Sequence, residues 1–398
     1  MEEKHIHYID AEQIENKTIL LRVDFNVSLN PNNLTIADDA RIRQGIPSIK
    51  YLIERGNKLI IVSHLGRPKE PHDPKFSMRI VCNQLQEYLP ELKIHLINDF
   101  LTEDLQIFKN QQKDEIIVLE NTRYYPGEKA NDEEFSKKLA SLAEIYVNDA
   151  FGVSHRAAAS VVGVTKYLPS YGGLLLKKEI EMISKVMQNA QHPVVSIIGG
   201  AKIETKINII DRLIEISDFV IIGGGLANTF LYAQGYDIGN SYAEKEQKDK
   251  ALQLIEKAKT KNIELVLPVD CVVGNTQELE KGGLVYKVKE IPADEQILDL
   301  GPETLARIGT VIAKAKTVIW NGPVGYFENP HYRQGTDFVY YAITNNPEAV
   351  SVVGGGDTLA AISKKEYLNK ITHISTGGGA MLEYIEKGTL PGIEALKR

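Results

Sequence analysis

The feature that most constrains this chain is the alternation of short apolar runs with amphipathic helical patterns along its whole length. Continuous apolar runs rich in β-branched residues are typical of parallel strands that are covered on both faces. They predict strands at residues 19–24, 59–64, 94–97, 116–120 and 145–148, and at 194–198, 219–222, 265–268, 317–320, 350–353 and 373–375. Strands that alternate with helices predict an α/β architecture with largely parallel sheets.

Helical periodicity fills the intervals between these strands. It predicts helices at residues 39–55, 77–88 and from Asn131 onward, and then at 203–216, 226–234, 244–260, 302–315, 358–365 and 381–387. Pro47 is expected to kink the first helix. Asn131 is a suitable N-cap because three acidic residues follow it, where the helix dipole favours anions. A short additional strand is expected within residues 286–294.

One amphipathic helix lies near the middle of the chain, between Pro169 and Asn189. Pro169, Gly172 and Gly173 interrupt the pattern before it, and Pro193 ends the region after it. Such a helix either fills space or connects two domains. We favour the connector because the two halves differ chemically: arginine and histidine follow the strands of the first half, and glycine clusters follow those of the second.

Composition limits the classes of protein that need to be considered. A chain of 398 residues is expected to form two or three domains. Its formal net charge of −7 argues against a dedicated nucleic-acid binder. No apolar run is long enough to cross a membrane, and the polar N-terminus does not resemble a signal peptide. Cys82 and Cys271 are too few for a disulfide framework, so a cytoplasmic location is expected.

Cationic side chains follow several predicted strands of the first half. In parallel sheets, ligands bind beyond the carboxyl ends of the strands. The segments at these ends are 22–26, 63–68, 120–123 and 148–156, and Arg41 begins the first helix. A single arginine is usually a solvated surface residue. Several that converge predict a small ligand with more than one negative charge, because guanidinium groups match phosphate and carboxylate oxygens.

Glycine clusters follow the strands of the second half, at residues 199–200, 223–225, 322, 354–356 and 377–379. Each cluster could serve only the tight turn from strand to helix, or could let the backbone approach a phosphate group. Clusters that recur along one sheet favour a nucleotide, although neither a P-loop nor a dinucleotide fingerprint is present. Asp357 is suitably located to meet a magnesium ion on the phosphates, and its alternative role is an ordinary N-cap.

The two halves together predict phosphoryl transfer between a nucleotide and a small anionic acceptor. A non-catalytic sugar-phosphate-binding protein is one alternative, which Lys202, Lys206 and Asp357 argue against because simple binding needs no magnesium ligand. A dehydrogenase on a doubly wound fold is another, and the missing dinucleotide fingerprint argues against it.

The same motifs resemble, in order, those of the phosphoglycerate kinase family. They are found at residues 22–27, 63–68, 148–156, 199–206, 320–328, 354–358 and 375–380. The resemblance implies two Rossmann-like α/β domains with mainly parallel sheets, joined by a central helix and hinge. It also implies a glycolytic kinase that transfers a phosphoryl group between 1,3-bisphosphoglycerate and ADP, giving 3-phosphoglycerate and ATP, with magnesium. We expect a monomer in the cytoplasm that binds neither nucleic acid nor membrane.

The resemblance also assigns residues. The phosphoglycerate site is expected at Asp24, Asn26, Arg41, His64, Arg67, Arg123 and Arg156. The nucleotide site is expected at Gly199, Lys202, Lys206, Gly223, Gly224, Asn321, Glu328, Gly354, Gly355, Gly356, Asp357 and Thr358. Asp357 would hold magnesium, and Arg41, Lys202, Gly355 and Gly378 would act on the transferred group. Four parts are expected: a phosphoglycerate-binding domain (1–170), the connecting helix (171–190), a nucleotide-binding domain (191–385) and a terminal segment that packs back on the first domain (386–398).

Ser28, Val324 and Tyr326 depart from the usual family residues, as does the segment 203–205. None of these departures changes a charged group of the expected sites, so they bear on nucleotide affinity and not on the activity.

Overall fold

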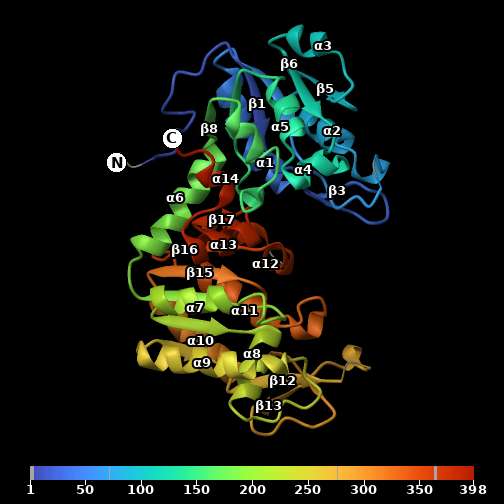
Figure 1. Ribbon diagram of the computed structural model, residues 1–398. Helices are drawn as coiled ribbons and strands as arrows, with labels where there is room; N and C mark the ends of the chain where they lie inside the picture. Colours follow the sequence, from blue (N-terminus) through green and yellow to red (C-terminus); the bar gives the residue numbers. More distant parts are fainter. Residues whose placement is uncertain (1–3, 71, 276, 363–364) are drawn as a thin grey trace. The chain divides into compact units, whose positions relative to one another are not determined.

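The computed structural model describes residues 4–70, 72–275, 277–362 and 365–398 (Figure 1). The chain divides into two compact units. The first unit holds the residues up to Glu181 together with Thr389–Arg398, and the second unit is Met182–Gly388. The chain therefore passes from one unit to the other twice.

The first unit is built on a six-stranded sheet in which all neighbouring strands are parallel. Its strand order is β5 (Lys93–Ile97), β6 (Glu115–Leu119), β4 (Lys58–Val62), β1 (Thr18–Arg22), β7 (Ile145–Asn148) and β8 (Ser170–Gly172). The predicted strands are confirmed, whereas β8 was not predicted. Strands β1 and β4 end two residues earlier than predicted, so Asp24 and His64 lie in the segments that follow them.

Helices and short turns connect these strands. The helices are α1 (Ala40–Ile53), α2 (Arg79–Tyr88), α3 (Leu105–Lys109), α4 (Pro126–Ala130), α5 (Glu133–Ala140) and α14 (Pro391–Glu394). The 3-10 helices are η1 (Pro74–Phe76), η2 (Thr122–Tyr124), η3 (Phe151–Val153) and η4 (Gly163–Lys166). A small antiparallel hairpin consists of β2 (Ser28–Leu29) and β3 (Ile36–Asp38). Buried aliphatic side chains of β1, β4, α1 and α2 form the core of this unit.

The predicted N-cap of α5 was wrong by one residue. Asp132 is the cap, and its side chain accepts a hydrogen bond from the Phe135 N–H at 2.8 Å. Asn131 instead ends helix α4 in the left-handed conformation, with φ 52°. Asparagine tolerates this conformation, and the prediction missed it because α4 itself was not expected.

The C-terminal segment is part of the first unit (Figure 1). The Gly392 N–H donates to the Ser154 carbonyl at 2.8 Å, and the Arg398 N–H donates to the His5 carbonyl at 3.2 Å. The Arg398 guanidinium lies 4.5 Å from the centre of the Tyr171 ring. Backbone pairing and a cation–π contact therefore fix the end of the chain on this unit.

The second unit contains a further six-stranded parallel sheet and a smaller antiparallel sheet. The parallel order is β11 (Glu264–Val266), β10 (Phe219–Ile222), β9 (Val194–Ile198), β15 (Thr317–Asn321), β16 (Val350–Gly354) and β17 (His373–Ser375). The antiparallel order is β13 (Leu284–Lys287), β12 (Asp270–Gly274) and β14 (Gln296–Leu300). The strand expected within residues 286–294 is thus shorter and earlier, and it belongs to a sheet that was not predicted.

The helices of this unit are α7 (Ile207–Ile216), α8 (Gly224–Ala233), α9 (Lys248–Thr260), α10 (Pro302–Lys314), α11 (Gln334–Thr344), α12 (Gly356–Ala361) and α13 (Gly379–Lys387). Its 3-10 helices are η5 (Lys245–Gln247), η6 (Leu279–Lys281), η7 (Pro330–Tyr332) and η8 (Lys365–Lys370).

Helix α12 ends before the predicted residue 365, and residues 363–364 lie outside the described residues. Helix α11 was not predicted. The group that caps its first turn is the carboxylate of Asp299 in β14, which accepts from the Gly335 N–H at 2.9 Å. A capping group so distant in sequence leaves no local pattern.

Helix α7 begins at Ile207 and not at residue 203. The intervening residues form a turn, in which the Lys206 N–H donates to the Ile203 carbonyl at 2.8 Å. The buried Glu244 carboxylate accepts hydrogen bonds from the Ile203 and Glu204 N–H groups. Glu244 thereby fixes the turn between the two lysines, Lys202 and Lys206.

The central helix is α6 (Leu174–Gln188), and the division between the units falls within it, after Glu181. Leu176, Ile183 and Val186 are buried, as the apolar stripe predicted. Gly173 does not adopt a left-handed conformation. A Cβ atom there would lie 2.2 Å from Oδ1 of Asp149. Lack of space beside Asp149 therefore accounts for a glycine at this position.

Candidate active site

The carboxyl ends of the first unit's strands enclose a cavity of about 1040 Å³. Four predicted site residues line it: His64 after β4, Arg67 further along the same loop, Arg123 in η2, and Arg156 after β7. Arg22 and Lys129 add two further cations, and Glu128 is the one acidic residue among those that line it within the described chain. The cavity wall is therefore strongly cationic.

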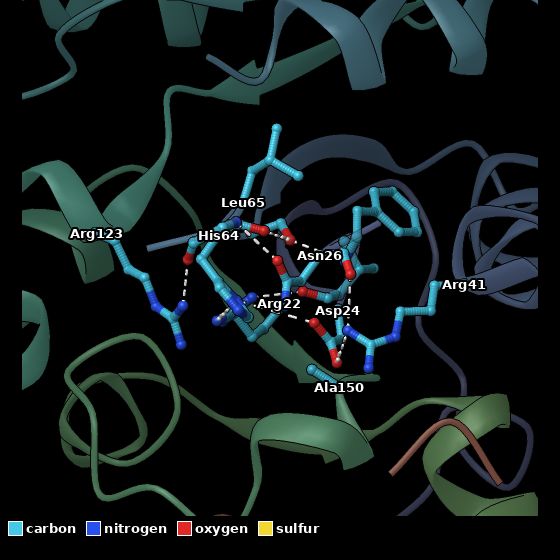
Figure 2. A network of polar contacts seen from close by, with 12 residues as sticks. Arg22, Asp24, Asn26, Arg41, His64, Leu65, Arg123 and Ala150 are labelled. Carbon is cyan, nitrogen blue, oxygen red and sulfur yellow. Dashed lines mark hydrogen bonds and ion pairs between the residues drawn. The ribbon is translucent and has the colours of Figure 1, made fainter. Parts of the chain in front are cut away.

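The other predicted residues form a polar network near this cavity (Figure 2). Arg41 donates to the Asn26 carbonyl at 2.8 Å and lies 3.3 Å from Oδ2 of Asp24. The Asn26 side-chain oxygen accepts from the Gly66 N–H at 2.7 Å, and Arg123 donates to the Gly66 carbonyl. The loops after β1, β4 and β6 are thus tied together by side chains that sequence analysis assigned to one site.

Asp24 has an unsatisfied hydrogen-bond acceptor, and Arg123 lies among an excess of positive charge. Oδ1 of Asp24 is buried and has no hydrogen-bond partner among the described residues. Burial, followed by the charges of Arg156 and Arg22, lowers the pKa of Arg123 to about 10. Arg123 therefore remains charged at neutral pH, in an excess of positive charge that an anion would balance.

His64 is buried and neutral. Burial and the nearby arginines, Arg22 first, hold the pKa of His64 well below its ordinary value. Its Nδ1 atom lies 3.4 Å from the Arg22 guanidinium and 3.9 Å from Asp24. An arginine can only donate a hydrogen bond, so this contact favours Nδ1 as the acceptor and the ring proton on Nε2.

Several residues of this site were not predicted from the sequence. Arg22 was noted in a strand-end motif but was not assigned to the site, and Tyr125, Glu128 and Lys129 were not considered. Arg22 could have been assigned from the sequence, because it is a cation at the end of the apolar strand β1 and a buried charge needs partners. Glu128 gave no such signal, because its partner Ser160 is distant in sequence.

The second unit contains a cavity of about 350 Å³ at the strand ends of its parallel sheet. Among the predicted residues, Gly224, Glu328 and Asp357 line it. Its other walls are mostly small or apolar, and include Ala201, Tyr242, Leu298 and Val324. A narrow apolar cavity that carboxylates border is suited to a planar ring with a polar substituent.

The glycines of the strand-end clusters differ in the space around them. A Cβ atom on Gly199 would lie 2.0 Å from the Pro323 carbonyl oxygen, and one on Gly224 would lie 2.7 Å from that of Gly200. Gly223 and Gly354 are similarly restricted by the side chains of Val324 and Met381. Close packing explains these four glycines without a ligand. Gly200, Gly356 and Gly379 belong to the strand-end clusters, and a Cβ atom on each would meet nothing within 4 Å, so these positions are open to a ligand.

Hydrogen bonds connect the remaining predicted residues at the ends of β15 and β16. Lys206 donates to Oδ1 of Asn321 at 2.7 Å, and the Asn321 amide donates to the Gly354 carbonyl at 2.8 Å. The buried Thr358 hydroxyl donates to the same carbonyl and accepts from the Gly322 N–H. Burial lowers the pKa of Lys206 to about 8, against the opposing effect of Asp357. Lys202, in contrast, is exposed.

The alternative role of Asp357 as an N-cap is wrong. Gly355 is the N-cap residue of α12, with φ 112°, and Asp357 is the second residue of the helix. Gly378 is the corresponding residue of α13, with φ 43°. Asp357 is exposed and borders the cavity. Its carboxylate is therefore available to an ion or ligand.

Two α/β units, one with a polycationic cavity and the other with a glycine-rich cavity at its strand ends, define an α/β protein with two candidate sites for anionic ligands. A family model described as phosphoglycerate kinase matches residues 9–388. The phosphoglycerate kinase of Dictyoglomus turgidum is 44% identical over 398 residues, which are 100% of this chain and of the relative. The chain belongs to the phosphoglycerate kinase family.

Solved structures agree with this assignment. Phosphoglycerate kinase from Coxiella burnetii is similar with a TM-score of 0.87 and 39% identity, covering 98% of this chain and 99% of that one. The Pyrococcus horikoshii enzyme is similar with a TM-score of 0.82 and 30% identity, covering 98% of both chains. The expected α/β fold and family are thereby confirmed. The chain is a glycolytic kinase that transfers a phosphoryl group reversibly between 1,3-bisphosphoglycerate and ADP.

None of the helices in the described part of the chain combines the length and the hydropathy that crossing a bilayer requires. The thiols of Cys82 and Cys271 are buried and free, and burial raises the pKa of each to about 12. Neither is a reactive thiolate at neutral pH.

Proposed function

We propose that the first unit binds 3-phosphoglycerate or 1,3-bisphosphoglycerate, and that the second unit binds ATP or ADP with magnesium. The observation that carries this proposal is the cavity of the first unit, where arginines from separate strand ends converge around a single lining carboxylate. A small molecule with a phosphate and a carboxylate would balance that charge by bidentate hydrogen bonds.

Individual residues have roles that match this substrate. Arg67, Arg123 and Arg156 would bind its anionic groups. Asp24 would accept from its hydroxyl with the buried Oδ1 atom, which has no hydrogen-bond partner within the described chain. His64 would donate through Nε2. Asn26 would fix the loop after β4 through the Gly66 N–H.

The nucleotide would occupy the smaller cavity, with its base against the apolar walls and its ribose hydroxyls on Glu328. The phosphates would extend toward Lys202, Lys206 and the open glycines near the start of α12. Helix N-termini provide free N–H groups for phosphate. Gly199, Gly223, Asn321 and Thr358 would support this backbone from behind, as their packing and hydrogen bonds suggest.

Magnesium fits the donors that are present. Among the described residues, no group of three or more His, Cys, Asp or Glu side chains is arranged to hold a metal ion. Magnesium on a nucleotide typically keeps several waters and uses only one or two protein carboxylates. Asp357, exposed at the cavity, would be that ligand. The ion would neutralise phosphate charge.

We infer a direct, in-line transfer after the two units close on their ligands. The acceptor is a carboxylate, so no general base is needed, and catalysis requires positioning and charge stabilisation. Arg41, Lys202 and the backbone N–H groups of Gly355 and Gly378 would stabilise the charge on the transferred group. Closure would bring the reacting atoms to within roughly 3–3.5 Å and exclude water.

A coupled assay tests the function. Purified protein with ADP, magnesium and 1,3-bisphosphoglycerate should form ATP, and no phosphoenzyme should accumulate. Tight binding of both ligands without turnover would contradict the proposal and favour a binding protein. We further propose that the enzyme is a cytoplasmic monomer, and a molecular mass above 44.4 kDa by light scattering would contradict that state.

A further inference from the structure

We propose that Glu128 is a positioning residue for the anion site, acting through Ser160 and Arg22 to fix the tautomer of His64. This inference rests on the proposed function for its kinetic consequence, because His64 is assigned there to substrate binding.

The first contact joins Glu128 in α4 to Ser160. Oε1 of Glu128 accepts from the Ser160 hydroxyl at 2.6 Å, and Oε2 accepts from the Ser160 N–H at 2.9 Å. Glu128 is 5% exposed and Ser160 is 1% exposed. The Tyr146 hydroxyl also donates to the Ser160 carbonyl at 2.7 Å. Both carboxylate oxygens are thus used to hold one serine in one orientation.

The second contact joins Ser160 to Arg22. The Ser160 hydroxyl accepts from Nε of Arg22 at 2.8 Å. A hydroxyl has a single proton, and here it is directed to Glu128, so its lone pairs are left to face Arg22. The negative charge of Glu128 is thereby coupled to the buried guanidinium, which the Val23 and Val62 carbonyls hold on its other side.

The third contact joins Arg22 to His64 (Figure 2). Nη2 of Arg22 lies 3.4 Å from Nδ1 of His64. Asp24 lies 3.9 Å from the same nitrogen, beyond hydrogen-bond distance, and would instead favour a proton there. The orientation of Arg22 therefore decides between two tautomers. With Arg22 held, the proton is on Nε2, where it can be donated to an anion.

A purely structural role explains this arrangement less well. Burying a carboxylate and a guanidinium costs several kcal/mol of desolvation per ion, and apolar residues often stabilise a core as well or better. Here the buried charges form one continuous series of hydrogen bonds from Glu128 to His64, and Glu128, Arg22 and His64 all line the cavity. A pair of Glu128 and Arg22 that only stabilised the fold would not need a hydrogen bond to His64.

Histidine NMR tests the series without any substrate. Two-bond ¹⁵N–¹H spectra of the ligand-free, full-length chain, assigned with a His64→Asn variant, should show His64 as the Nε2–H tautomer. In Ser160→Ala and in Glu128→Gln, we expect a mixture that includes the Nδ1–H form. Ser136→Ala is the matched control, because this buried serine donates only to the Asp132 carbonyl. It should leave His64 unchanged.

Kinetics provide the second measurement. In both variants KM for 3-phosphoglycerate should rise roughly tenfold, the effect of weakening one charged hydrogen bond, while KM for ATP stays within twofold. An unchanged KM for ATP also shows that the variants are folded. If the His64 tautomer is the same as in the wild type in both variants, the proposal is wrong whatever the KM values. If the tautomer changes but the wild type does not turn over 3-phosphoglycerate, the series is supported and the proposed function fails.

Discussion

At the residue scale, Arg41 is the clearest test of the catalytic assignment. It lies 3.3 Å from Asp24 and donates to Asn26, so its position is set by groups of the anion site. We expect Arg41→Ala to lower kcat by about 10³-fold, because an arginine on a moving phosphoryl group can contribute that much. The dissociation constant of 3-phosphoglycerate should change far less.

Arg43→Ala is the matched control for this substitution. Arg43 is on the same helix, is more exposed than Arg41, and pairs with Asp39 at 2.8 Å. An exposed pair of this kind contributes little, so kcat should be close to that of the wild type. Near-normal kcat in Arg41→Ala would remove this residue from the mechanism.

Asp357 provides a second test at this scale. Asp357→Asn should weaken binding of magnesium nucleotide by at least tenfold while 3-phosphoglycerate binds as before, because the two cavities are lined by different units. Calorimetric titration of each ligand measures both affinities. Nucleotide titrated with a chelator in place of magnesium is the control, and there the variant and the wild type should differ little. Equal losses for both ligands would show that the sites are not separate.

At the element scale, Asp149 connects strand β7 to the start of helix α6. Its Oδ1 atom accepts from the Leu175 and Leu176 N–H groups at 2.8 and 3.1 Å. Burial raises the pKa of Asp149 from 3.8 to about 7, with these hydrogen bonds acting in the opposite direction. The carboxyl is therefore protonated in the folded chain at pH values where the unfolded chain has lost the proton.

The sign of the pH dependence follows from this difference. Between pH 3.8 and about 7 the folded chain holds a proton on Asp149 that the unfolded chain does not, so the contribution of Asp149 to stability falls as pH rises. In Asp149→Asn the free energy of unfolding should fall less steeply across this window, by on the order of 1–3 kcal/mol in total. Urea titrations at pH 5 and pH 8 measure it. If the free energy of unfolding changes by the same amount between pH 5 and pH 8 in the variant and the wild type, the raised pKa of Asp149 is contradicted.

At the scale of the whole molecule, the two ligands are assigned to different units, and transfer requires their reacting atoms to meet. We therefore expect the radius of gyration from small-angle scattering to be smaller with both ligands than with either alone. The non-transferring mixture of 3-phosphoglycerate and ADP gives a stable ternary complex for this measurement. A radius that is unchanged when this complex forms would contradict closure, even if the enzyme is active.

The sequence determined the architecture, and it predicted most residues of the candidate site, because strands and the segments that follow them have local sequence patterns. Buried parallel strands are continuous apolar runs, and strands β9, β10 and β17 were predicted with their observed ends. Since ligands bind beyond such strand ends, the residues that follow them could be assigned before the structure was known. His64, Arg67, Arg123 and Arg156 do line one cavity.

Only the tertiary structure decided features whose partners are far apart in the chain. Asp299 in strand β14 caps helix α11. Ser160 joins Glu128 to Arg22, which are more than 100 residues apart in the chain. The glycine clusters looked alike in sequence, yet Gly199 is needed for close packing while Gly356 has open space. Hydrogen bonding and steric exclusion between distant segments depend on their positions in space, and no local pattern encodes those positions.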